Sequence, residues 1–160
     1  MHYRNNGAIG ALLDEYEKSI KELISLCRNI SNEELIVIVD KETKDPDCVS
    51  IQTILTHVVE SGYNYSVIIY KHISTDTHYK EKQLFDTIPE YVSALSEMFA
   101  YSETLFNKLT NDQIEVKDPA LKIKVRWGQY YDIEQLMEHA IVHVLRHRRQ
   151  IERFLIKLRK

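Results

Sequence analysis

The residues of this chain best suited to chemistry are three histidines, His139, His143 and His147, which follow one another at four-residue intervals. Residues four apart on a helix lie on the same side, with Cβ atoms roughly 5–6 Å apart, so two neighbouring imidazoles of the series can bind one cation. Imidazole is a ligand for zinc, nickel, copper and iron alike. The spacing therefore predicts a metal site on a helix and leaves the metal open.

The apolar pattern of the same helix indicates which of these histidines point inward. His147 falls in the middle of the apolar face, His143 nearer its edge, and His139 further out. His57 lies on the shoulder of the apolar face of an earlier helix, a position that can face a neighbouring helix. We therefore expect His143 and His147 to form the inward pair and His57 to be the third ligand.

A three-histidine site of this kind is catalytic rather than structural, because closed structural zinc sites use four protein ligands and favour cysteine. Its open position can bind water or a thiolate. A di-iron carboxylate site is disfavoured, since that design needs paired Glu-x-x-His motifs that the chain does not supply. In the alternative interpretation, His147 is a hydrogen-bonded core histidine, and His143 and His139 lie at a polar edge.

Two polar residues near the histidines are candidates for a supporting role. Glu60 lies one turn after His57 and could orient an imidazole, activate water or face solvent. Gln150 lies three residues after His147, where it could hydrogen-bond a ligand or cover the edge of the helix packing. Of the two, Glu60 is the catalytic candidate.

The composition indicates one ordinary globular domain, residues 1–160, with 44% hydrophobic and 28% charged residues. Four glycines and three prolines are too few for a turn-rich β architecture, so the expected fold class is all-α. The formal net charge of −3 gives no general attraction to nucleic acid or to an anionic membrane. We expect neither as a partner.

The cysteines and the apolar runs bear on the cellular compartment. Cys27 and Cys48 are the only cysteines, form no C-x-x-C pair, and are expected to be free thiols. The segment 1–7 lacks the apolar stretch of a secretory signal, and no run of about 18 apolar residues occurs. These features predict a cytoplasmic protein.

Four segments with a 3.6-residue apolar repeat predict four long helices that together form a four-helix bundle. The first runs from about Gly7 to Asn29, the second starts after Ser50, the third has Thr87 as its N-cap, and the fourth starts after Asp132. A short helical turn with a capping box is expected after Ser31.

The connection before the last helix is unusually long. Its alternating stretches on either side of Asp118-Pro119 predict a short hairpin. Loops longer than about 12–15 residues are often lids or crossovers, and we expect this one to be the long crossover loop of the bundle.

The chain resembles the DinB/YfiT-like family, four-helix metal-dependent enzymes that are unrelated to the DNA polymerase of similar name. The resemblance rests on Thr56-His57-Val58-Val59-Glu60 in the second helix, Trp127, and the closing helix segment His139–Ile151, and it covers nearly the whole chain. It implies an up-down-down-up four-helix bundle, often a homodimer, with His57, His143 and His147 as the metal ligands. The family's usual closing motif is His-Arg-Gly-Gln, and here Arg149 stands in place of the glycine, on the outward face.

The resemblance also implies a range of activities. Similar proteins include thiol-dependent S-transferases and isomerases in which the metal activates a low-molecular-weight thiol, while others have no assigned reaction. We therefore expect zinc or nickel as the cofactor, a small-molecule substrate, and transferase or hydrolase-like chemistry. The alternative is a non-catalytic helical bundle that binds a ligand or a partner, because fold and metal ligands do not by themselves define a reaction.

The end of the last helix is strongly basic, with residues Arg146, Arg148, Arg149, Arg153, Lys157, Arg159 and Lys160. Such a cluster can form a nucleic-acid patch. Cations near a helix C-terminus also complement the helix dipole and occupy the solvated face. We favour this second interpretation.

Overall fold

A computed structural model describes residues 3–74 and 79–160 of the chain. This part is mostly helical, as the all-α prediction requires. The long helices are α1 (Gly7–Cys27), α3 (Ile51–Ile73), α4 (Ile88–Phe106) and α6 (Ile133–Leu158). The short elements are α2 (Asn32–Ile36), η1 (Pro46–Cys48), α5 (Asn111–Ile114), η2 (Pro119–Leu121), β1 (Ile123–Lys124) and β2 (Tyr130–Tyr131).

The helices begin where the capping residues predict. The Ser50 hydroxyl accepts a hydrogen bond from the backbone N–H of Thr53 at 3.1 Å, and the Asp132 carboxylate accepts one from the N–H of Gln135 at 2.9 Å. Thr87 is the N-cap of α4, as expected. The Ser50 and Asp132 side chains each bind a backbone N–H that has no partner within the helix, and this fixes the residue at which the helix starts.

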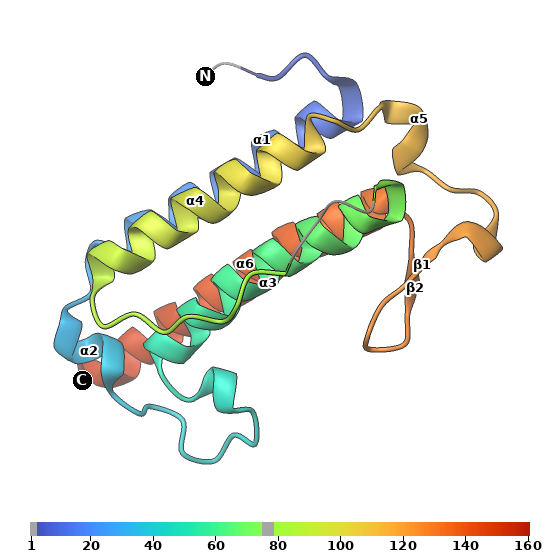
Figure 1. Cartoon of the computed structure of the whole chain (residues 1–160). Coiled ribbons are helices and arrows are strands. Elements are labelled where there is room, and N and C mark those ends of the chain that lie inside the picture. The colour runs from blue at the N-terminus through green and yellow to red at the C-terminus, as the bar shows by residue number, and fades with distance from the viewer. Residues whose placement is uncertain (1–2, 75–78) are drawn as a thin grey trace.

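The four long helices pack side by side around one apolar core (Figure 1). Helix α1 contacts α4 and α6, and α3 contacts the same two helices. One leucine from each helix is fully or almost fully buried: Leu13, Leu55, Leu95 and Leu136. Burial of this apolar surface is the main force that holds the helices together. Among the described residues, no helix combines the length and the apolar content needed to cross a membrane.

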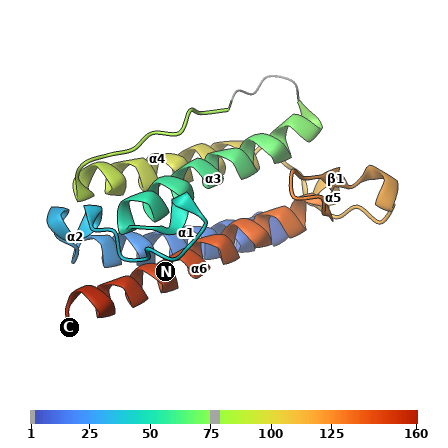
Figure 2. The same ribbon diagram turned by 90° about the horizontal axis from the view of Figure 1, so that it is seen from below.

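Contacts along the helices give their relative directions. Thr56 contacts Tyr91 near the start of α3 and α4, and Ser66 contacts Ser102 further along both helices. Helices α3 and α4 therefore run in the same direction. Residues 79–87, the described part of the connection that leads into α4, return along the length of the helices, and Figure 2 shows them outside α3 and α4.

The prediction that the crossover precedes the last helix is therefore wrong. Helices α4 and α6 run in opposite directions, so residues 107–132 join two ends on the same side of the molecule (Figure 1). The segment is long because it contains local structure: α5, η2 and a two-stranded hairpin. Helix α5 contacts the start of α1, where Asn111 Oδ1 accepts a hydrogen bond from the N–H of Ile9. Loop length alone did not distinguish a crossover from a folded cap on one end.

The predicted hairpin exists but is displaced along the chain. Strands β1 and β2 pair antiparallel, with Ile123 opposite Tyr131, and Gly128 adopts a φ of +87° in the turn between them. A positive φ suits glycine because a Cβ would be strained there. Asp118 instead caps η2, its carboxylate accepting from the N–H of Ala120. The Asp118-Pro119 pair therefore begins a 3₁₀ turn and not the turn of the hairpin.

Candidate metal centre

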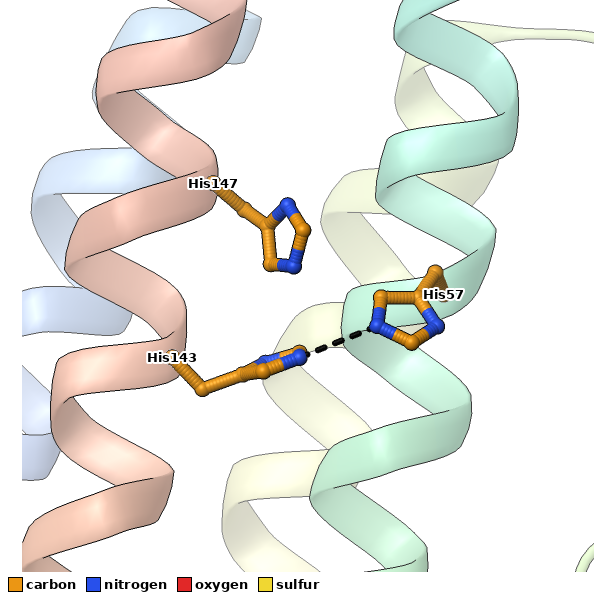
Figure 3. A group of neighbouring side chains, drawn as sticks. All are labelled: His57, His143 and His147. Atoms are coloured by element: carbon orange, nitrogen blue, oxygen red, sulfur yellow. Dashed lines mark hydrogen bonds between the residues drawn. The ribbon is translucent and has the colours of Figure 1, made fainter. Parts of the chain in front are cut away.

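Three imidazole rings converge between α3 and α6. His57 comes from α3, and His143 and His147 come from successive turns of α6 (Figure 3). The ring centroid of His57 lies 4.9 Å from that of His143 and 5.1 Å from that of His147, and the centroids of His143 and His147 are 4.4 Å apart. One nitrogen from each ring lies within 4.8 Å of the other two. The three histidines that the sequence selected are thus close enough to bind one metal ion.

The three rings differ in exposure. His143 is 5% and His147 3% exposed, whereas the side chain of His57 is 27% exposed. This agrees with the helical pattern, which put the α6 pair on the apolar face and His57 on a shoulder. The site is therefore closed on the α6 side and accessible to solvent on the α3 side.

The Nε2 atoms of His57 and His143 are spaced like two ligands of one ion. His57 Nε2 and His143 Nε2 are 3.0 Å apart (Figure 3). Two nitrogen ligands of a tetrahedral zinc ion with Zn–N bonds near 2.05 Å would be about 3.3 Å apart. Two imidazole lone pairs repel at such a distance unless a proton or a cation lies between them.

His147 gives an independent test of whether the residues fit a metal. Its Nε2 atom is buried and has no hydrogen-bond partner among the described residues. A buried polar nitrogen without a partner costs about 1–3 kcal/mol in proteins. Coordination to a cation would remove that cost. The donor set therefore fits a divalent metal that accepts nitrogen ligands.

The other nitrogen of two rings faces a polar acceptor. His57 Nδ1 lies 3.3 Å from Asp47 Oδ2, and His147 Nδ1 donates to Gln150 Oε1 at 3.1 Å. Acceptors on Nδ1 hold the proton there and leave the Nε2 lone pair free, an arrangement found around metal-bound histidines. Gln150 thus hydrogen-bonds His147, one of the candidate ligands.

The surroundings also keep the α6 pair uncharged. Burial, with smaller contributions from the neighbouring imidazoles, lowers the pKa of His143 to about 2. Burial and the nearby His57 lower the pKa of His147 to about 4. The positive charge of Arg146 acts in the same direction on both rings. Neutral imidazoles are the form that binds metals, so the pair is in its ligand form at neutral pH.

A second group of side chains supports His57 from the solvent side. Asp47, His57 and Glu60 each offer one atom within 4.8 Å of the others. Lys82 pairs with both carboxylates, at 3.4 Å from Glu60 Oε2. Glu60 thus lies beside the Asp47–His57 pair and does not belong to the three-histidine group. Its predicted catalytic role stays a prediction.

Sequence reasoning missed Asp47 and Lys82. Asp47 belongs to η1, which packs against α3, and Lys82 belongs to the return segment after α3. Helical periodicity places residues only within a helix, so it says nothing about loops that fold back onto one. The single available signal was the position of Asp47 three residues before the Ser50 cap.

His139 lies outside the three-histidine group. Its ring stacks on Trp127 with centroids 5.5 Å apart and also contacts Tyr65 and Tyr131. These contacts attach the hairpin to the start of α6. Tyr65 contacts His143 as well, at 5.6 Å between centroids, so the aromatic cluster borders the candidate metal centre.

Both cysteines are free thiols, as predicted. Burial raises the pKa of the Cys27 thiol to about 12, which removes it from nucleophilic chemistry at neutral pH. Cys48 is partly exposed, and its Sγ lies 3.8 Å from Gln150 Oε1. Neither sulfur belongs to the three-histidine group.

A small cleft lies beside the aromatic cluster. It has a volume of about 120 Å³, and its lining includes Ser61, Asn64, Tyr65, Arg126 and Trp127. Tyr65 connects this cleft with His143. The cleft therefore offers an apolar and aromatic surface next to one of the candidate ligands.

Comparison of the sequence with protein-family models finds no match, and comparison with curated proteins finds none.

Proposed function

We propose that the protein is a metal-dependent enzyme in which His57, His143 and His147 bind one divalent cation, zinc or nickel. The observation that carries the proposal is the convergence of three imidazoles in which the buried Nε2 of His147 has no partner among the described residues. Burial of two neutral imidazoles side by side costs free energy, and coordination of both rings to one ion would offset that cost.

The proposed reaction class follows from the number of ligands. When bound by three histidines, a divalent cation keeps a position at which a water or a low-molecular-weight thiol loses its proton more readily. This supports a thiol-dependent S-transferase or a hydrolase-like enzyme acting on a small molecule. His57, the most exposed ligand, lies on the side from which such a molecule would enter. Tyr65 and Trp127 supply an apolar surface for its organic part.

The carboxylates beside His57 act through that ligand in this proposal. Asp47 holds the proton on His57 Nδ1 and so directs Nε2 toward the ion. Glu60 is paired with Lys82, which also binds Asp47. These contacts favour an orienting role for Glu60 over direct activation of water.

The course of the helices supports the family resemblance. The parallel direction of α3 and α4 and the long return between them support an up-down-down-up four-helix bundle. That topology and the three ligand positions support a DinB/YfiT-like protein. A cytoplasmic location and a homodimer are proposed on the strength of that resemblance alone.

The proposal can be tested by metal-linked stability. Zinc at a hundred times its Kd should stabilise the native state by about 2.7 kcal/mol, or about 5–10 °C in Tm for a chain of this size. His57→Ala should abolish the shift. His72→Ala is the matched control, because His72 is an exposed histidine on the same helix. A non-catalytic bundle without a metal predicts no shift for any variant, and that result would refute the proposal.

A further inference from the structure

A second cleft, larger than the aromatic one, lies along α6 close to the metal centre. Its volume is about 300 Å³. Four cations of α6 line it together with Gln150 and a single carboxylate from the loop before α3: Arg146, Arg149, Arg153, Lys157 and Asp40. We call this the basic cleft.

The four cations share one face of α6. They stand at intervals of three, four and four residues, which places successive side chains one above the other. Like charges at this spacing repel one another. The face is therefore electrostatically unfavourable until something negative lies on it.

The protein itself provides little negative charge for this face. Elsewhere on α6, Arg148 pairs with Glu22 and Glu152, and Arg159 pairs with Glu34. By contrast, no ion pair within 4 Å joins any of the four cations of the basic cleft to a carboxylate of the described residues.

Asp40 is the one acidic residue among those that line the cleft, and its carboxylate stabilises its own loop. Its Oδ1 accepts hydrogen bonds from the backbone N–H groups of Glu42 and Thr43, both at 3.1 Å. This carboxylate shapes the loop that forms the opposite wall. The lining of the basic cleft thus has four cations and a single anion.

The helix dipole explains only part of this charge. Its effect falls off within the last turn of a helix, and Lys157 lies in the last turn of α6. Arg146 and Arg149 lie about three and two and a half turns before the end. The helix dipole therefore does not account for these two arginines, although both are exposed, as expected of a solvated face. Arg149, which was expected on the outward face, is exposed and lines the cleft.

The basic cleft adjoins the metal centre through Gln150. This residue lines the cleft, and its Oε1 accepts the hydrogen bond from His147 Nδ1. Arg146 directly precedes His147 in the sequence. A molecule held in the cleft is thus separated from a candidate ligand by one side chain.

We propose that the basic cleft binds the anionic group, a phosphate or a carboxylate, of a small-molecule substrate. Arginine matches both groups because its planar guanidinium donates two parallel hydrogen bonds. That the bound molecule is a substrate rests on the proposed function, whereas the binding of an anion rests on the cleft alone. A cleft of about 300 Å³ fits a small molecule. The net charge of −3 opposes binding of a nucleic acid.

The test is titration calorimetry of the full chain with inorganic phosphate and, separately, succinate at one fixed ionic strength. Wild type should bind at least one of them, and the tighter binder identifies the anionic group. The double variant Arg149→Gln/Arg153→Gln should weaken binding by about 10-fold for each arginine. Lys117→Gln/Lys160→Gln removes the same charge outside the cleft and should stay within about twofold of wild type.

Three outcomes would overturn the inference: no binding of either anion by wild type, an equal loss in both double variants, or tighter binding of a DNA duplex that the arginine variant abolishes. The metal content of each variant separates the two proposals. Loss of anion binding in Arg149→Gln/Arg153→Gln with the metal retained supports the cleft. An unchanged metal content in His147→Ala, with anion binding intact, refutes the metal site and leaves the cleft standing.

Discussion

The contact between Asp47 and His57 gives the most specific prediction about the metal centre. Asp47→Asn keeps the size and shape of the side chain and removes its charge. The carboxylate lies 3.3 Å from His57 Nδ1, where it favours the tautomer with the proton on Nδ1 and so directs the Nε2 lone pair toward the ion. With asparagine at this position, the imidazole loses its anionic partner and becomes a weaker ligand.

The size of the loss in metal affinity depends on the surroundings of Asp47 and His57. Removing a partner of a metal-bound histidine lowers metal affinity about 10–100-fold, or about 1.4–2.7 kcal/mol. Asp47 also pairs with Lys82, and the side chains of Asp47 and His57 are 28% and 27% exposed. Shared charge and solvent screening both weaken the interaction. We therefore expect a loss near the lower end, about 10-fold.

The assay is competition for zinc against a chromophoric chelator at pH 7.5, which gives the affinity of each variant directly. Asp118→Asn is the matched control, since Asp118 is an aspartate at another 3₁₀ turn, η2, in the segment before the hairpin. Affinity within about twofold of wild type for Asp47→Asn would refute the assigned role of this carboxylate.

Three further predictions concern the buried rings, Glu60 and the approach of α3 to α4. Folding lowers the pKa of His143 to about 2 and of His147 to about 4, so below pH 6.5 the unfolded chain binds more protons. As the pH falls from 6.5 to 4, the free energy of unfolding of the metal-free protein, measured in urea, should therefore decrease by up to about 1.4 kcal/mol per pH unit for each ring. An equal free energy of unfolding at pH 7 and pH 5 would contradict this. Glu60→Gln should lower zinc affinity less than about threefold, because its ion-pair partner is Lys82, and a loss as large as that of Asp47→Asn would make Glu60 an equal partner of His57. Gly62→Ala would place a Cβ against the buried Met98 side chain and should cost about 1–3 kcal/mol; a higher Tm would show that this contact yields freely.

The sequence predicted the helices and the histidine cluster well, for a physical reason. Helical periodicity determines which side chains share a face, and caps such as Ser50 and Asp132 determine where a helix starts. Once α3 and α6 face each other, His57 and His143 follow from their positions on those faces. Local rules were sufficient because the three histidines lie on regular helices.

The same rules failed where the chain leaves a helix. Asp47 and Lys82 reach His57 and Glu60 from loops, and periodicity does not describe the path of a loop. The position of the crossover depends on whether consecutive helices run in the same direction, which is a property of the packing. The basic cleft likewise needs Asp40 from another element to form its opposite wall. These features emerge only from tertiary contacts.

The metal content of tag-free protein tests the central claim most directly. Elemental analysis should find close to one zinc or nickel ion per chain in the wild type and a small fraction of that in His147→Ala, because this variant removes the ligand whose Nε2 has no partner among the described residues. Wild-type protein that takes up no divalent metal, or an equal metal content in the two proteins, would contradict the account.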